Sequence, residues 1–127
     1  MKRILIVDDE AALRSTLRML LEKKGYECEE AEDGIQALER LSRQTIDLVI
    51  TDLAMPNMDG EALIQRMSEN EKWESIPVIC ISGNLSLSPH HFKKPITILE
   101  KPINSNFLLT ILNNLLKTEK SSNEPTA

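Results

Sequence analysis

Residues 48–60 carry the sequence LVITDLAMPNMDG, and this stretch decides the fold. Its first four residues are apolar or β-branched without interruption, which is the pattern of a strand buried on both faces. The run stops at the acidic Asp52, and turn-forming residues follow as far as Gly60. Because helices must cover both faces of such a strand, the stretch predicts a parallel sheet enclosed by helices.

The same organisation repeats along the chain. Strand patterns predict further strands over residues 4–7, 26–31, 76–81 and 96–99. Apolar residues at helical spacing predict helices over residues 11–23, 35–41, 62–70 and 103–116. Strands and helices that alternate in this way build an α/β domain with right-handed crossovers, a doubly wound (βα)5 arrangement around a five-stranded parallel sheet.

Length and charge limit the possible functions. A chain of 127 residues fits one domain, which we place at residues 1–117, with a disordered tail or the start of a linker at 118–127. Fifteen Lys and Arg against twenty Asp and Glu give a net charge of −5. This balance argues against direct binding of a nucleic-acid backbone, which depends on clustered cations.

The sequence predicts a cytoplasmic protein that does not enter a membrane. It has no run of about 18 apolar residues that could span a bilayer. The apolar run at residues 4–7 reaches Asp8 too soon for a secretory signal. Cys28 and Cys80 are far apart and in apolar or strand-like surroundings, so we expect buried, reduced thiols rather than a metal or disulfide site.

Charged and hydroxyl side chains gather where the predicted strands end. Asp8 and Asp9 follow the first strand, and Asp52 follows the central one. Ser82 and Lys101 follow the last two strands. In parallel α/β sheets, ligands bind beyond the carboxyl ends of the strands, where the strand order switches. These side chains are therefore predicted to meet at one edge of the sheet.

The chemistry of this set favours a magnesium ion and a phosphoryl group. Carboxylates at close range need a cation among them, and a hard, oxygen-seeking ion such as Mg²⁺ fits. Asp8 and Asp9 would hold the metal, with the backbone carbonyl of Ala54 as a further oxygen ligand. Asp52 can act as a carboxylate nucleophile towards phosphorus, while Mg²⁺ and Lys101 offset the charge of the transferring group.

These motifs resemble the receiver domain of two-component response regulators. The matching segments are VDDE at residues 7–10, DLAMPNMDG at 52–60, IPVI at 76–79 with Ser82, and Lys101-Pro102. The resemblance covers about residues 2 to 117. It implies a flavodoxin-like fold of the CheY type.

The resemblance also implies a function. Asp52 would be the phospho-acceptor, with the Ser82 hydroxyl and Lys101 contacting the phosphoryl group. The Mg²⁺ ligands would be Asp8, Asp9, Asp52 and the backbone carbonyl of Ala54. A sensor histidine kinase or a histidine phosphotransfer protein would be the phosphohistidine donor, and a downstream protein target, which the sequence does not identify, would receive the signal. Phosphorylation would shift a pre-existing equilibrium between two conformations of the last third of the domain.

Two features depart from the family pattern. Ile98, three residues before Lys101, stands where the family often has Tyr or Phe, so the usual coupling of the switch serine to an aromatic ring is absent. Residues 84–95 contain two prolines and little helical periodicity, so we expect a short or irregular fourth helix there. Both features concern the transmission of the signal rather than the acceptance of phosphate.

Other functions are weaker alternatives. A phosphate-independent, receiver-like interaction module is the main one, favoured by Ile98 and by residues 84–95. An aspartyl-phosphate phosphatase usually needs a second acid near the nucleophile, and Ala54, two residues after Asp52, supplies none. A flavin site is disfavoured because no Ser-, Thr- or Gly-rich phosphate loop follows the first strand. We expect no enzyme activity beyond self-phosphotransfer and self-dephosphorylation.

Overall fold

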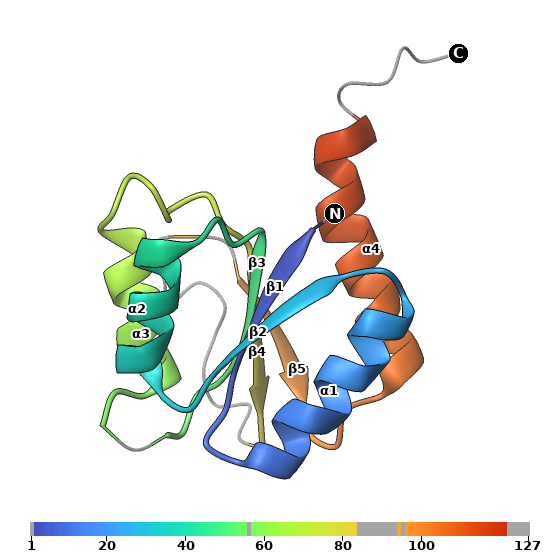
Figure 1. Cartoon of the computed structure of the whole chain (residues 1–127), viewed down its shortest axis with the longest axis horizontal. Helices are drawn as coiled ribbons and strands as arrows, with labels where there is room; N and C mark the ends of the chain where they lie inside the picture. Colours follow the sequence, from blue (N-terminus) through green and yellow to red (C-terminus); the bar gives the residue numbers. More distant parts are fainter. Residues whose placement is uncertain (1, 56, 84–93, 95, 122–127) are drawn as a thin grey trace.

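A five-stranded parallel sheet forms the centre of the computed structural model, with helices on both faces (Figure 1). The structure describes residues 2–55, 57–83, 94 and 96–121. Within these, the strands are β1 (Arg3–Val7), β2 (Glu27–Ala31), β3 (Leu48–Asp52), β4 (Val78–Ser82) and β5 (Ile96–Glu100). The helices are α1 (Ala11–Lys23), α2 (Gly34–Arg43), α3 (Gly60–Ser68) and α4 (Ser105–Ser121). The predicted α/β class with five parallel strands is confirmed.

The strand order is β2-β1-β3-β4-β5, and every pairing is parallel. The chain passes from β1 to β2 on one side and then returns to place β3 on the other side of β1, so the order reverses between β1 and β3. In this class of sheet the reversal opens a crevice at the carboxyl ends of the two strands. At one edge of the sheet, β2 has the sequence ECEEA, and its charges disfavour pairing with the edge of another chain.

Alternate residues of each strand pack on opposite faces of the sheet. On β1, Ile4 and Ile6 join the core shared with α1 and α4, while Leu5 and Val7 join the core shared with α2 and α3. Figure 1 shows the two helical layers, with α2 and α3 on one side of the sheet and α1 and α4 on the other. Buried β-branched and Leu side chains fill both layers, as expected for strands without an exposed face.

The two cysteines are buried and free, as predicted. Cys28 lies in the core beneath α1 and α4, and Cys80 lies in the core beneath α2 and α3. Burial raises the pKa of Cys28 to about 11 and that of Cys80 to about 12. Both thiols are therefore protonated at neutral pH and serve as small apolar side chains.

The last helix differs from the prediction at both ends. It begins at Ser105 rather than at residue 103, because the Asn104 side chain caps it by accepting a hydrogen bond from the Phe107 amide at 3.0 Å. It continues to Ser121, so the first residues of the expected tail are helical. The domain boundary at residue 117 stays a prediction.

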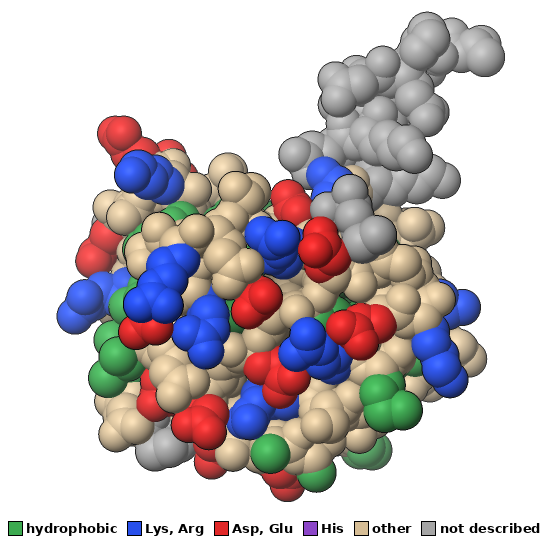
Figure 2. All heavy atoms as spheres, viewed as in Figure 1, with side chains coloured by type: hydrophobic (Ala, Val, Ile, Leu, Met, Phe, Trp, Pro, Cys, Tyr) green, Lys and Arg blue, Asp and Glu red, His purple; other side chains and the backbone are tan. Residues whose placement is uncertain are grey.

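The predicted short or irregular helix over residues 84–95 falls outside the described residues, apart from Lys94. On the face seen in Figure 2, Lys and Arg side chains intermingle with Asp and Glu. Among the residues described on that face, no concentrated basic patch of the kind needed to follow a phosphate backbone is visible. No helix in the described part of the chain has the length and hydropathy needed to cross a bilayer.

The loop that follows β3 is tied to the start of α2. Asp33 caps α2 by accepting a hydrogen bond from the Gln36 amide at 2.9 Å, and its second oxygen accepts one from the Asn57 side chain at 2.8 Å. The Gly34 amide donates to the Met58 carbonyl at 2.9 Å. Asn57 adopts a left-handed conformation with φ of 65°, which asparagine tolerates better than most residues. The loop is thus held at two successive residues.

Replacing Asp33 with alanine is expected to lower the free energy of unfolding by about 2 kcal/mol, because a helix cap and a bond between two loops are lost together. The bonds from Gln36 and Asn57 lower the pKa of Asp33. The carboxylate therefore stabilises the fold above the ordinary aspartate pKa and loses this effect as the pH falls through its lower value. Urea unfolding followed by Trp73 fluorescence should show the gap between wild type and variant closing below about pH 4.

Asp59→Ala is the matched control. Asp59 caps α3 through the Ala62 amide at 2.9 Å but lies at an exposed position. Its loss is expected to cost about 1 kcal/mol. Equal losses in the two variants would show that the bond between Asp33 and Asn57 adds nothing to stability.

Candidate functional site

Four strand ends converge at the reversal in strand order. Asp8 directly follows β1, and Asp52 is the last residue of β3, the neighbouring strand. Ser82 ends β4, and Lys101 directly follows β5. The Lys101 amide donates to the Ser82 carbonyl at 3.0 Å, which extends the pairing of β4 and β5 by one bond. The structure thus places these side chains at one edge of the sheet.

Three carboxylates form the centre of the site. One oxygen from each of Asp8, Asp9 and Asp52 lies within 4.8 Å of the others. Asp8 is 4% exposed and Asp52 is 8% exposed, while Asp9 lies at the surface. Two of the three negative charges are therefore largely removed from water, and the third closes the group on its open side.

The crowding is visible in the electrostatics of Asp8. Burial raises the pKa of its carboxyl, and the nearby charges of Asp52 and Asp9 act in the same direction. The Glu10 amide opposes this shift by donating to Asp8 Oδ1 at 2.8 Å. The positive charge of Lys101 also opposes it, yet the pKa of Asp8 stays raised, so a cation among the three carboxylates would stabilise the charged form.

Lys101 supplies a fixed positive charge next to Asp52. Its Nζ donates to Asp52 Oδ2 at 3.0 Å, and this bond raises the pKa of Lys101. The other carboxylate oxygen, Oδ1, accepts a hydrogen bond from the Ala54 amide at 3.2 Å. Both oxygens of Asp52 thus have a donor, and the carboxylate is held in one orientation at the end of the central strand.

Gly60 lets the loop after β3 return closely to that strand. A Cβ atom at this position would overlap the Asp52 carbonyl oxygen. The Gly60 amide donates to the Leu53 carbonyl at 2.9 Å, and the Thr51 hydroxyl donates to the Asp52 carbonyl at 2.8 Å. Any larger residue at Gly60 would push the loop away from the carboxylate.

Several contacts of the site were not predicted from the sequence. The predicted side chains all end or directly follow a strand, apart from the Ala54 carbonyl, whereas Gly60 and the pair of Asp33 and Asn57 act on the loop between β3 and α3. Asp33 and Asn57 are 24 positions apart, and no local pattern links them. The sequence marks each as a turn residue, but only the fold shows that the two turns touch.

The two residues relevant to signal transmission are placed as follows. Ser82 is buried, at 6% exposure, at the end of β4. Ile98 lies on β5, where it is partly buried and packs against the core shared with α2 and α3. The switch function of Ser82 and the ligand function of the Ala54 carbonyl stay predictions.

The donor set fits the predicted metal. It consists of carboxylates alone, and hard cations such as Mg²⁺ prefer oxygen ligands. Zinc would favour Cys or His ligands, and this cluster contains neither. Because Mg²⁺ keeps several of its waters, a few protein oxygens on one side are sufficient.

A doubly wound parallel sheet with an acidic cation site and a lysine at its switch point defines a class of α/β signalling domains, the CheY-like domains. The family model of the response regulator receiver domain matches residues 4–113. The chain therefore belongs to the response regulator receiver domain family. Members of this family accept phosphoryl groups in two-component signalling and are not enzymes in the usual sense.

Solved structures and curated proteins agree with this assignment. A CheY-like receiver domain protein from Methanospirillum hungatei is 27% identical, with a TM-score of 0.86 over 96% of this chain and 98% of that one. The receiver domain of a histidine kinase from Syntrophus aciditrophicus is 28% identical, with a TM-score of 0.84 over 100% and 97%. The CAI-1 autoinducer sensor kinase/phosphatase CqsS of Vibrio cholerae is 44% identical over 87 residues, which are 67% of this chain and 12% of that kinase.

Replacing Asp8 with asparagine is expected to stabilise the metal-free domain. The change removes one charge from a crowded, buried group and keeps an oxygen that can accept the Glu10 amide, so we expect a gain of about 1 kcal/mol, or a few degrees in Tm. The same variant should lose most of its Mg²⁺ affinity, because a charged ligand becomes neutral. Thermal melts in EDTA and in millimolar Mg²⁺ measure both effects.

The exposed Asp59→Asn serves as the control for this experiment, since Asp59 lies outside the acidic cluster. It should leave the Mg²⁺-dependent rise in Tm unchanged. A lower Tm for Asp8→Asn in EDTA would contradict the conclusion that burial and the neighbouring carboxylates disfavour a negative charge at this position.

Proposed function

We propose that this chain accepts a phosphoryl group from a phosphohistidine onto Asp52 in a Mg²⁺-dependent reaction and signals by a change of conformation. The observation that carries the proposal is the contact of 3.0 Å between Lys101 Nζ and Asp52 Oδ2 beside the acidic cluster. A nucleophile, a cation site and a fixed ammonium group stand together, and phosphoryl transfer depends mainly on such positioning and charge compensation.

The transfer itself needs little from the protein beyond placement. An oxygen of Asp52 forms a bond to phosphorus while the bond from phosphorus to the donor imidazole nitrogen breaks, and the leaving imidazole takes up a proton. Lys101 pairs with a phosphoryl oxygen, and the Ser82 hydroxyl donates a hydrogen bond to another. When bound, Mg²⁺ supplies positive charge for the remaining oxygens. Asp8, Asp9, Asp52 and the Ala54 carbonyl would hold the ion.

Attack of water on the acyl phosphate regenerates Asp52 and releases phosphate, which is the self-dephosphorylation of this proposal. Ala54 lies two residues beyond Asp52 and is exposed, so the approach of water passes a small apolar side chain. No further enzymatic activity is part of the proposal.

The partners in this proposal follow from the relatives. Several curated relatives are sensor kinases. The matched part of this chain spans only 12% of the length of CqsS and 7% of the length of another sensor protein, EvgS. A sensor histidine kinase or a histidine phosphotransfer protein is the proposed donor. The downstream partner is proposed to be a protein, and a cytoplasmic location fits donors of this kind.

A phosphate-independent interaction module is the second candidate. It is favoured by Ile98, because an aliphatic side chain cannot form the aromatic half of the family's switch. The two candidates differ in one measurable property, the covalent capture of phosphate by Asp52.

Incubation with acetyl phosphate or phosphoramidate and Mg²⁺ should add one phosphate to the protein, detected by intact mass as an acid-stable, base-labile group. Asp52→Asn should remove this phosphate completely, because the amide is not a nucleophile towards phosphorus. Asp59→Asn, a change of the same kind in the following loop, should leave it intact. Incorporation that persists in Asp52→Asn would reject Asp52 as the acceptor.

Lys101→Met tests the charge at the same site. We expect the rate of phosphorylation to fall on the order of 10²-fold, because a preorganised positive charge is removed from the transferring group. If the wild type captures no phosphate from a small donor or from a phosphohistidine protein, the interaction module becomes the better proposal.

A further inference from the structure

Arg14 connects helix α1 to the backbone of a carboxylate residue of the site. Its Nη1 atom donates to the Asp8 carbonyl oxygen at 2.6 Å, across the turn between β1 and α1. The Asp8 amide donates to the Ala31 carbonyl at 3.1 Å. The backbone on both sides of the Asp8 side chain is therefore held, once by the neighbouring strand and once by Arg14.

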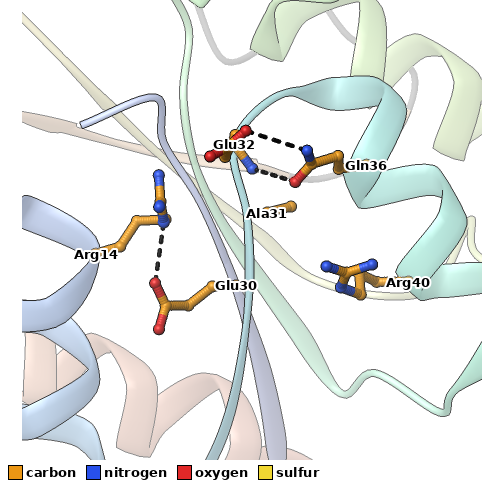
Figure 3. A pocket seen from close by; sticks show the side chains of 6 residues that line it. All are labelled: Arg14, Glu30, Ala31, Glu32, Gln36 and Arg40. Atoms are coloured by element: carbon orange, nitrogen blue, oxygen red, sulfur yellow. Dashed lines mark hydrogen bonds and ion pairs between the residues drawn. The ribbon is translucent and has the colours of Figure 1, made fainter. Parts of the chain in front are cut away.

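Arg14 is itself held from the neighbouring strand. Its Nε atom donates to Glu30 Oε1 at 2.9 Å, and Figure 3 shows the two side chains directed at each other from α1 and β2. The Arg14 side chain is only 11% exposed. Glu30 Oε2 also accepts a bond from Arg18 Nη1 at 2.8 Å, one turn further along α1. Bonds from Arg18 and Arg14 lower the pKa of Glu30, so its charge is secure at neutral pH.

The start of α1 lacks the side-chain cap that α2 and α3 have, so it relies on other contacts. Glu10, at the N-cap position of α1, makes no capping bond with its side chain, whereas Asp33 and Asp59 cap α2 and α3. The Asp8 side chain accepts the Glu10 amide instead, so a residue of the acidic cluster also holds the helix start. Any shift of α1 would move Asp8 and, with it, the adjacent Asp9.

The geometry points to Arg14 as a positioning residue of the metal site: with Glu30 it holds the turn that presents Asp8 and Asp9 to Mg²⁺. This inference rests on the proposed function, since it assumes that the acidic cluster binds Mg²⁺. Magnesium requires near-ideal octahedral geometry, so it tolerates little displacement of its ligands. Groups that orient metal ligands in this way commonly change metal affinity by about 10- to 100-fold.

The sign of the effect separates positioning from charge. Arg14 is a cation near the metal site, so its charge alone repels Mg²⁺, and removing that charge would tighten binding. Loss of positioning would weaken binding. Arg14→Met keeps much of the aliphatic stem and removes the guanidinium group, so the two effects have opposite directions in one variant.

The test is a titration of the full chain with Mg²⁺ alone, followed by calorimetry and by the amide NMR signals of Asp8 and Asp9. We expect Arg14→Met to raise the Kd for Mg²⁺ about tenfold. In phosphorylation with acetyl phosphate, the Mg²⁺ concentration at half-maximal rate should rise, while the rate at saturating Mg²⁺ stays within about twofold, because Asp52 and Lys101 keep their contact.

Arg18→Met is the matched control. Arg18 lies on the same helix, carries the same charge and shares Glu30 as a partner, but its guanidinium group bonds to Glu22 and Glu30 rather than to Asp8. Its replacement should leave the Kd unchanged within about twofold or lower it slightly. An equal rise of the Kd in both variants would indicate a general loosening of α1 rather than a role of Arg14 itself. That result would overturn the inference.

A second pair of variants tests the same inference in case Arg14→Met does not fold well. Glu30→Ala removes the anchor of Arg14, and Glu29→Ala removes the same charge from the adjacent position of β2. Both variants lose one negative charge, but only Glu30→Ala should weaken Mg²⁺ binding further, because only Glu30 holds Arg14. Equal Kd values in this pair would overturn the inference.

The outcomes for the inference and for the proposed function are distinct. A wild-type chain that binds no Mg²⁺ would remove the proposed function and the inference together. A wild type that binds Mg²⁺, together with an Arg14→Met variant that binds it as tightly or more tightly, would overturn the inference alone.

Discussion

Repulsion among the carboxylates of Asp8, Asp9 and Asp52 is the constraint on which the site depends. The reversal in strand order brings their oxygens within 4.8 Å of one another, with two of the three side chains buried. Such a group would separate or become protonated unless other parts of the chain held it in place. Lys101, whose Nζ lies 3.0 Å from Asp52 Oδ2, offsets part of this negative charge. A divalent cation could bind among the three carboxylates and offset more of it.

The surrounding structure can be understood as a support for this group. On one side, Arg14 and Glu30 hold the turn between β1 and α1. On the other side, the bond between Asp33 and Asn57 holds the loop after β3, and Gly60 allows that loop to return close to the strand. The Arg14–Glu30 and Asp33–Asn57 bonds join segments 16 and 24 positions apart, so the stability of the fold and the geometry of the site depend on the same contacts.

The fold and the centre of the site were largely predictable from the sequence. Apolar strands that alternate with amphipathic helices indicate a covered parallel sheet, and the residues after parallel strands meet at one edge. The ends of α4 were less predictable, because the cap by Asn104 and the extension to Ser121 depend on local choices that apolar periodicity does not register. The departure at Ile98 stays a prediction, and the structure shows that its partly buried side chain packs against the core shared with α2 and α3.

The element order, the buried faces and the identity of the acidic residues with Lys101 can be inferred from the sequence, because hydrophobic period and strand-end position are local properties of the chain. How these residues are held depends on the packing of the folded chain. Arg14 appears in the sequence as one polar residue of an amphipathic helix, and Glu30 as one charge on an edge strand. Their contact, and the bond from Arg14 to the Asp8 carbonyl, exist because the parallel pairing of β1 and β2 sets α1 against both strands. Hydrogen-bond partners at such separations are set by packing, which no local pattern encodes.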